Sequence, residues 1–378
     1  MPVTRFRDIE SAKADGAELG TAQLPCLLYT TSGTTSDPKL VVHAQGRIVE
    51  FAREVAAAVG YDRPGACSLQ AVPFCGTYGF IQAMAALMGG APMVLMHTFN
   101  AQEAASLIRD KGVTLSGMTD EMVRAVYAVE RETRPFPGLR LFVGTRAHEL
   151  LPLADQRGFR LLSGYGSSEI QALFSRRLDH EDAGQRATGG GTPVSATAKV
   201  RARDAGTGVI LPPGEAGEIE ILAPSIMLGY LNDAEATARA FTADGYYRTG
   251  DLGFVATDGS WTFLNRIGDS FRLSGFLVNP LEIESHVRKA PGVDLCYVVG
   301  VEFGGSTAVV AFYTSGEAAA EDSLRLHCLE GMARYKVPRR FVRVREFPMI
   351  DSMNTRKLDR NALRERALVM LAAEAAPD

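Results

Sequence analysis

Cysteine is scarce in this sequence, and its spacing excludes the common cysteine-based sites. The five cysteines lie far apart, without the close pairs that bind zinc or form redox motifs. They are Cys26, Cys67, Cys75, Cys296 and Cys328. We therefore expect buried free thiols rather than disulfides or a metal centre.

Two further absences narrow the function. The chain contains no GxxxxGK pattern, so a phosphate-binding loop of the Walker type is excluded. Residues 1–24 mix Arg, Asp, Glu and Lys without an apolar run. This pattern predicts neither a signal peptide nor a membrane span, and it favours a cytoplasmic location.

The net charge is also small. A formal net charge of −4 gives no general attraction to nucleic acid or anionic lipid, so neither is expected as a partner. Residues 334–345 (RYKVPRRFVRVR) are locally basic. Two interpretations of this segment stay open: the solvated surface of a strand pair, or a binding site for a partner.

The order of apolar segments predicts an α/β fold with more than one domain. The 378 residues are 46% hydrophobic and 22% charged, as in an ordinary globular protein. Strand-like and helix-like runs alternate over the first two-thirds, which is typical of βα units and a largely parallel sheet. Residues 199–264 change to short strands between Gly, Pro and Asp turns, which indicates an antiparallel barrel or sandwich. A small α+β unit follows, and the Ala-rich tail after Arg364 is expected to fray.

A run of hydroxyl side chains follows the first predicted strand. Residues 29–39 read YTTSGTTSDPK. Hydroxyls and backbone N–H groups of such a turn can surround a polyphosphate, and the lysine adds a positive charge. Clusters of Ser, Thr and Gly are also typical of solvated loops, and composition alone favours that second interpretation.

Several motifs that follow in order along the chain favour the phosphate-binding interpretation over a solvated loop. Residues 31–39 (TSGTTSDPK) resemble the TSGTTGxPK signature of the adenylate-forming superfamily, which includes acyl- and aryl-CoA synthetases, adenylation domains of nonribosomal peptide synthetases, and luciferase. Residues 164–169 (GYGSSE) resemble its GYGxTE motif, and residues 246–251 (YYRTGD) its TGD motif. Residues 265–284 and 354–360 (NTRKLDR) resemble its hinge segment and its closing lysine motif.

The resemblance implies the adenylate-forming enzyme fold. We expect residues 1–267 to form a large domain that binds ATP and an acid, with a β-barrel subdomain over about 195–264. Residues 268–378 would form a small mobile α+β domain. Gly268 falls at the family's hinge position, where a glycine favours rotation.

The resemblance also implies a two-step reaction. A carboxylic acid attacks the α-phosphorus of ATP to give acyl-AMP and pyrophosphate, and the acyl group then passes to a thiol. The acceptor is coenzyme A, or the phosphopantetheine of an acyl or peptidyl carrier protein. The first step requires charge neutralisation, Mg²⁺ and donors at the reacting oxygens, with little covalent chemistry from the protein.

Particular residues take roles by this resemblance. The β- and γ-phosphates are expected to contact Thr31, Ser32, Gly33, Thr34, Thr35 and Lys39. Ser168 would contact the α-phosphate, and Glu169 would bind Mg²⁺. Lys357 would bridge the α-phosphate and the attacking carboxylate.

The remaining nucleotide contacts are expected around Gly164, Tyr165 and Gly166. Tyr165 would stack on adenine, and Asp251 would accept from both ribose hydroxyls with Arg266 nearby. Each has a structural alternative when taken alone: Tyr165 as an interior aromatic, Asp251 as a turn cap, and Lys357 as a surface lysine. For Arg248 and Arg266, salt bridges between strands are an equal alternative.

The expected acid is fatty, branched or aromatic. Residues 73–80 (PFCGTYGF) resemble the family's PLFHxxG pocket segment, with Gly76 in place of the histidine. Thr77 stands where amino-acid-activating relatives carry an aspartate, so a substrate ammonium would be buried without a partner. Weaker pocket candidates are Tyr78, Gly144, Thr145, Arg146, Gly164 and Gln171. Gly275 is expected to face the thiol tunnel.

The sequence departs from the family at several points. The signature is reached by residue 31, whereas relatives carry well over a hundred residues before it. The resemblance thus implies that a first subdomain is missing and that a homodimer shields the surface. Ser36, Arg272 and Arg356 replace common residues. Two alternatives therefore stay open: a non-catalytic nucleotide-binding or scaffolding relative, and a stand-alone amino-acid adenylating enzyme.

Overall fold

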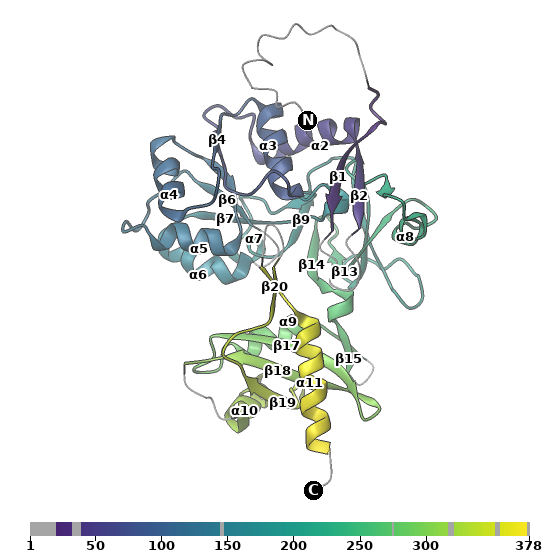
Figure 1. The fold of residues 1–378 in the computed structure, drawn as a ribbon. Helices are drawn as coiled ribbons and strands as arrows, with labels where there is room; N and C mark the ends of the chain where they lie inside the picture. The colour runs from purple at the N-terminus through teal and green to yellow at the C-terminus, as the bar shows by residue number, and fades with distance from the viewer. Residues whose placement is uncertain are drawn as a thin grey trace, which may run out of the picture.

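The molecule has a large and a small body (Figure 1). This computed structural model describes residues 20–31, 39–143, 147–273, 276–316, 321–351 and 356–375. The first two-thirds of the chain form the large body, and the C-terminal α+β unit lies beneath it. The short strand β20 extends from the small body towards the large one. The predicted α/β class is confirmed.

Five parallel strands form one half of the main sheet, as the alternating pattern predicts. They are β4 (Met93–Leu95), β3 (Ser68–Gln70), β5 (Leu115–Gly117), β6 (Arg140–Val143) and β7 (Arg160–Tyr165). The connecting helices are α3 (Thr77–Gly89), α4 (Ala101–Asp110), α5 (Asp120–Ala128) and α6 (Leu151–Arg157), with α2 (Gln45–Val59) before them. Local chemistry sets their ends: the Asn100 side chain caps α4 by accepting from Glu103 N, and left-handed Gly60 ends α2.

Antiparallel strands continue the same sheet. Its eleven strands run β10-β11-β13-β14-β9-β8-β7-β6-β5-β3-β4. The added strands are β8 (Ser175–Arg176), β9 (Gly190–Pro193), β10 (Lys199–Arg203), β11 (Gly217–Leu222), β13 (Tyr247–Val255) and β14 (Trp261–Arg266). Strands β8 and β9 join these strands to β7 through hydrogen bonds. The β-barrel subdomain expected over about 195–264 stays a prediction.

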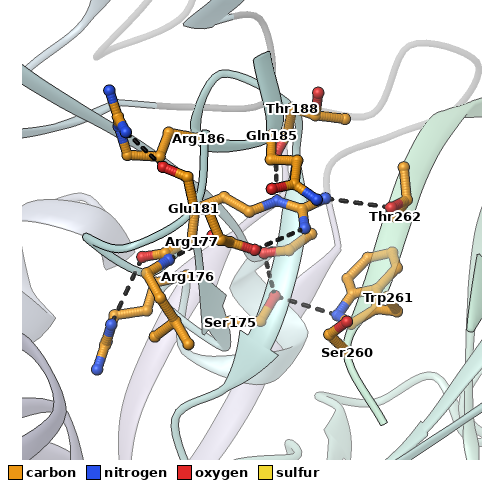
Figure 2. A network of polar contacts seen from close by, with 12 residues as sticks. Ser175, Arg176, Arg177, Glu181, Gln185, Arg186, Thr188, Ser260, Trp261 and Thr262 are labelled. Carbon is orange, nitrogen blue, oxygen red and sulfur yellow. Dashed lines mark hydrogen bonds and ion pairs between the residues drawn. The ribbon is translucent and has the colours of Figure 1, made fainter. Parts of the chain in front are cut away.

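A polar network fixes the junction between the two halves (Figure 2). The indole N–H of Trp261 donates to Ser175 Oγ across 3.1 Å, and this hydroxyl donates to Gly190 O. The Arg177 guanidinium contacts Thr188 O and Thr262 Oγ1, at 2.9 and 3.1 Å. Because Arg177 is buried, these contacts replace the hydration that its guanidinium loses. Arg177 directly follows β8 and Thr262 belongs to β14, so the contacts also connect these two strands. The short helix α7 (Ala183–Arg186) lies within this segment.

A second sheet brings the start of the chain to the main sheet. It contains β1 (Pro25–Thr30), β2 (Leu40–Ala44) and β12 (Gly229–Tyr230), in the order β1-β2-β12. Tyr29 and Val41 point into the core, whereas Leu28 and Leu40 lie on the exposed face. Helix α8 (Ala234–Ala240) follows β12.

The small body is built on a three-stranded sheet. Strands β17 (Leu295–Phe303), β18 (Ser306–Thr314) and β19 (Arg340–Arg343) pack against α9 (Pro280–Val287), α10 (Glu321–Gly331) and α11 (Arg360–Ala375). The short hairpins are β15 (Phe271–Leu273) with β16 (Phe276–Val278), and β20 (Met349–Asp351) with β21 (Arg356–Leu358).

Two expectations for the chain's peripheral features are met in part. The tail after Arg364 is helical to Ala375, and Leu363, Ala367 and Leu371 repeat every four residues and are fully buried against β17 and β18. All five cysteines are free; Cys296 and Cys328 are buried as expected, whereas Cys26 and Cys75 are exposed.

Two basic side chains of segment 334–345 form ion pairs within the small body. Lys336 pairs with Glu282 at 2.6 Å, and Arg340 pairs with Glu321 and Glu374. These contacts favour the interpretation as a solvated strand surface. Within the described ranges, no helix has both the length and the apolar character needed to cross a bilayer.

Candidate functional site

The ends of the predicted phosphate loop are closed on each other. Thr31 N donates to Lys39 O across 2.9 Å, and Lys39 N donates to Thr31 Oγ1 across 3.1 Å. These bonds extend the β1–β2 ladder by one pair beyond Thr30 and Leu40. The other predicted phosphate contacts (Ser32, Gly33, Thr34 and Thr35), with Ser36, lie outside the described residues.

The turn after β7 carries the predicted α-phosphate and metal ligands. Gly164 and Tyr165 end the strand, and the 3-10 helix η2 (Ser168–Ile170) follows. Only glycine fits at position 166, because a Cβ there would lie 1.0 Å from Ala172 O. Gln171 and Ala172 then adopt left-handed φ angles of 59° and 65°. Such conformations are costly for residues other than glycine and concentrate at functional sites.

Strand β2 and helix α3 both contact this turn. The Nε2 of His43 on β2 lies 2.7 Å from Ser168 O, so this nitrogen carries the proton and donates. Burial lowers the pKa of His43, which keeps the ring neutral. Thr77 Oγ1, at the start of α3, donates to Ser168 Oγ across 3.2 Å.

The metal-binding candidate Glu169 is held at both its backbone and its side chain. Met227 N donates to Glu169 O across 2.8 Å, and the Tyr230 hydroxyl donates to Glu169 Oε1 across 3.0 Å. The Tyr230 ring in turn carries the Lys39 ammonium 4.8 Å from its centroid. Glu169 and Lys39, at the end of the predicted phosphate loop, therefore contact the same side chain.

Asp251, in β13, is linked to the end of β7. It is 1% exposed, accepts a hydrogen bond from the Tyr165 hydroxyl, and pairs with Arg266 at 2.8 Å across the β13–β14 ladder. Burial raises the pKa of Asp251 to about 6, against the opposing effect of Arg266; the Glu169 charge adds to the rise. Arg266 serves as the strand-pairing salt bridge that the sequence left as an alternative.

Tyr165 occupies an interior position in this structure. The ring meets Trp261 edge-on, with centroids 4.5 Å apart, and its residue is 5% exposed. This agrees with the alternative of an interior aromatic, and stacking on adenine stays a prediction. Arg248 lies 3.9 Å from Glu218 on the neighbouring strand.

The predicted acid-pocket residues are only partly brought together. Gly76 is the N-cap of α3 and places Thr77 against Ser168. The Tyr78 hydroxyl instead donates to Phe142 O at the end of β6, and Gln171 is buried against Ser225 O. Gly144, Thr145 and Arg146 lie outside the described residues, as does the tunnel candidate Gly275.

The mobile-domain candidates are placed by their backbone. Lys357 pairs with Ile350 in the β20–β21 hairpin. Gly268 belongs to the 3-10 helix η3 (Ile267–Asp269), and its carbonyl accepts from Arg364 of α11 across 2.9 Å. Asp269 also contacts α11, through Arg364 at 2.9 Å and Arg360 at 3.4 Å.

The residues of this site fit a magnesium nucleotide. Magnesium in such sites takes one or two carboxylates, with water and substrate phosphates completing its shell. Glu169 supplies a hard carboxylate oxygen beside the ammonium of Lys39. No group of three or more metal-ligating side chains occurs within the described part of the chain.

Sequence reasoning missed His43 and Tyr230. Neither falls within a matched motif, although His43 lies four residues after Lys39, on the strand β2 that begins at Leu40. Tyr230 reaches the site because β12 pairs with β2, bringing Tyr230 opposite Val41. That pairing joins segments almost two hundred residues apart, and no local signal predicts it.

Comparisons with known proteins agree with this arrangement. The family model for AMP-binding enzyme matches residues 7–231, and the model for AMP-binding enzyme C-terminal domain matches residues 282–353. Sulfoacetate–CoA ligase from Cupriavidus necator is 31% identical over 348 residues, covering 88% of this chain and 66% of that protein. 2-Succinylbenzoate–CoA ligase from Geobacillus kaustophilus is 30% identical over 332 residues, covering 86% and 66%.

A solved structure shows the same fold. It is O-succinylbenzoate coenzyme A synthetase from Bacillus subtilis in complex with ATP and magnesium ion, with a TM-score of 0.79 and 24% identity. The match covers 94% of this chain and 74% of that one. The chain thus spans about two thirds to three quarters of the length of these proteins. Since the first family model matches more than half of its residues and the second matches its small body, this chain belongs to the AMP-binding enzyme family.

Proposed function

We propose that this protein uses ATP to activate a non-amino carboxylic acid as acyl-AMP and then transfers the acyl group to the thiol of coenzyme A. The supporting observation is one connected set of contacts. Lys39 and Glu169 both contact Tyr230, Ser168 precedes Glu169 and accepts from Thr77, and Asp251 accepts from Tyr165 at the end of β7. This set offers a cation for phosphates, a carboxylate for Mg²⁺ and an acceptor for a ribose.

In the first step, the protein's task is to neutralise and orient charge. Lys39 would bind the β- and γ-phosphates as a point charge, and Ser168 would donate to the α-phosphate. Bound Mg²⁺ supplies charge neutralisation at the phosphates as pyrophosphate leaves. Glu169 would hold that ion, and Asp251 would fix the ribose. Lys357, on the β20–β21 hairpin, would stabilise the charge that grows between carboxylate and α-phosphate.

The type of acid follows from the surroundings of Ser168. Thr77 presents a hydroxyl there, and that hydroxyl already donates to Ser168 Oγ. The ammonium of an amino acid would have no carboxylate partner at this position. A fatty, branched or aryl acid is therefore our proposal, and an amino acid is the second candidate.

Coenzyme A is the acceptor that the relatives favour, since two relatives at 30% identity or more are named as CoA ligases. A carrier-protein phosphopantetheine is the alternative, because it carries the same thiol. The boundary near residue 268, a mobile small domain and a cytoplasmic location stay predictions. A homodimer also stays a prediction; the exposed Leu28, Leu40 and Leu231 offer apolar surface for it. A strict monomer in light scattering at micromolar concentration would refute the dimer.

Pyrophosphate exchange tests the function. ATP and Mg²⁺ are incubated with labelled pyrophosphate and a panel of short, branched, long-chain, aryl and amino acids. We expect exchange with at least one non-amino acid, followed by thioester formation when coenzyme A is added. Absence of exchange with every acid, under conditions where ATP binding is measured directly, would favour a non-catalytic nucleotide-binding relative.

A further inference from the structure

Tyr230 lies between the two oppositely charged side chains of the candidate site. Its ring faces the ammonium of Lys39, 4.8 Å from the ring centroid, and its hydroxyl donates to Oε1 of Glu169 across 3.0 Å. No ion pair joins Lys39 to Glu169 directly among the residues that the structure describes. Tyr230 is thus a physical spacer between them.

The backbone holds this spacer in one position. Tyr230 N donates to Thr237 Oγ1 across 2.9 Å, and that hydroxyl donates to Asp233 O across 2.8 Å. The preceding Gly229 has a φ of 154°, and a Cβ there would lie 2.8 Å from Thr237 Cγ2. The segment is therefore packed tightly onto the start of α8, and its tyrosine is not a loosely held surface residue.

The same segment fixes Glu169 twice. Met227 N donates to the backbone carbonyl of Glu169, and the Tyr230 hydroxyl donates to its carboxylate. A phenolic hydroxyl can donate, and an ionised carboxylate can only accept, so Tyr230 is the donor of this bond. A carboxylate oriented by a hydrogen bond on one oxygen presents its other oxygen in a defined direction.

Direct contact between an ammonium and a carboxylate would neutralise both groups. Such a pair has to be broken before the carboxylate can bind a cation and the ammonium can bind a phosphate. An aromatic ring avoids this cost, because its face attracts a cation weakly and without hydrogen bonds. The arrangement leaves both charges available to a ligand.

We propose that Tyr230 is a positioning residue, which orients Glu169 for Mg²⁺ and keeps Lys39 available for the phosphates of ATP. The inference rests on the proposed function, since it requires a magnesium nucleotide at this site. It gives one side chain two separable roles. The hydroxyl orients Glu169 and so affects Mg²⁺ binding, and the ring holds Lys39 and so affects phosphate binding.

Two variants separate these roles. Tyr230→Phe keeps the ring and removes the donor, whereas Tyr230→Leu removes both. ATP binding is measured by calorimetry with and without MgCl₂. For Tyr230→Phe we expect wild-type ATP affinity without Mg²⁺, and about a 10-fold rise in the Mg²⁺ concentration that half-saturates the effect of the metal. For Tyr230→Leu we expect weaker ATP binding in both conditions.

Controls link these effects to the site. Tyr246→Phe changes another tyrosine that carries a cation, with Arg201 3.7 Å from its ring centroid, and should leave both affinities unchanged. In a Glu169→Gln background, Tyr230→Phe should add no further change in Mg²⁺ dependence. Thermal unfolding of each variant establishes that it is folded.

The outcomes distinguish the two proposals. Normal Mg²⁺ dependence in folded Tyr230→Phe, or equal Mg²⁺-free ATP affinity in the Phe and Leu variants, would overturn the inference alone. Failure of the wild-type protein to bind ATP would overturn the proposed function together with it.

Discussion

The hydroxyl of Tyr165 donates a hydrogen bond to the carboxylate of Asp251, joining the end of β7 to β13. The bond connects the parallel half of the sheet to its antiparallel half at the point where a nucleotide is proposed to bind. Both residues are almost fully buried, so the carboxylate has little hydration to offset its charge. An ionised carboxylate at this position therefore costs stability.

Replacing Asp251 by Asn should stabilise the protein near neutral pH. Because burial raises the pKa of this carboxyl from 3.8 to about 6, the folded state binds its proton more tightly than the unfolded state does. The ionised group then lowers stability increasingly as pH rises from about 4 to 6, by at most about 3 kcal/mol. Urea unfolding of both proteins at several pH values would show a gain above pH 6 that vanishes below pH 4.

The same variant should bind ATP more weakly, by about 10- to 100-fold, because a charge-assisted acceptor for the ribose is lost. Greater stability combined with weaker binding is the expected signature of a functional buried charge. An Asn variant that is less stable at neutral pH would contradict the role assigned to burial.

Gly166→Ala should disrupt the turn that carries Ser168 and Glu169. The added methyl group would overlap Ala172 O, and neither backbone can move without disturbing the strained residues that follow. We expect a loss of several kcal/mol in unfolding free energy, or no soluble protein. Gly138→Ala is the matched control, because a Cβ at Gly138 meets no atom within 4 Å. Similar melting temperatures for the two variants would refute this account of the turn.

Lys357→Ala should separate the two half-reactions. If Lys357 acts on the α-phosphate, adenylate formation falls sharply, while transfer to coenzyme A from a preformed acyl-adenylate is largely kept. Single-turnover assays of each step provide the measurement. Equal damage to both steps would show that the lysine acts in some other way.

The C-terminal helix should contribute directly to stability. Leu371 is fully buried against β17 and β18, so Leu371→Ala is expected to cost about 2–5 kcal/mol. Val369, on the same helix, is 70% exposed, and Val369→Ala should change stability by less than about 0.5 kcal/mol. Chemical denaturation distinguishes these outcomes, and equal small effects would mean that the helix frays in solution.

The sequence predicted the parts of the site that lie in contiguous motifs. Tyr165 ends β7 and Ser168 and Glu169 follow it, and the TGD motif places Asp251 within β13. Each motif is a short contiguous segment that can be recognised without knowledge of the fold, although β13 lies in the antiparallel half of the sheet. The small body was predictable from its alternating strands and helices for the same local reason.

Long-range pairing was beyond sequence reasoning. The continuity of the main sheet depends on Thr262 pairing with Gly190, and the position of Tyr230 depends on β12 pairing with β2. Such pairings are decided by the packing of whole layers, for which a short segment carries no signal. The buried face of α11 was visible in its four-residue repeat, but its place at the chain terminus suggested a fraying helix.

The contacts of Gly268 bear on how the small body could turn. Its carbonyl and the neighbouring Asp269 are both fastened to α11 by Arg364, and Arg360 adds a third tie to Asp269. Residue 268 consequently travels with the small body as long as these ties hold. Arg266 is held in the β14 ladder opposite Asp251, so the backbone torsions that absorb a rotation would then be those around Ile267, directly after the arginine that pairs with Asp251.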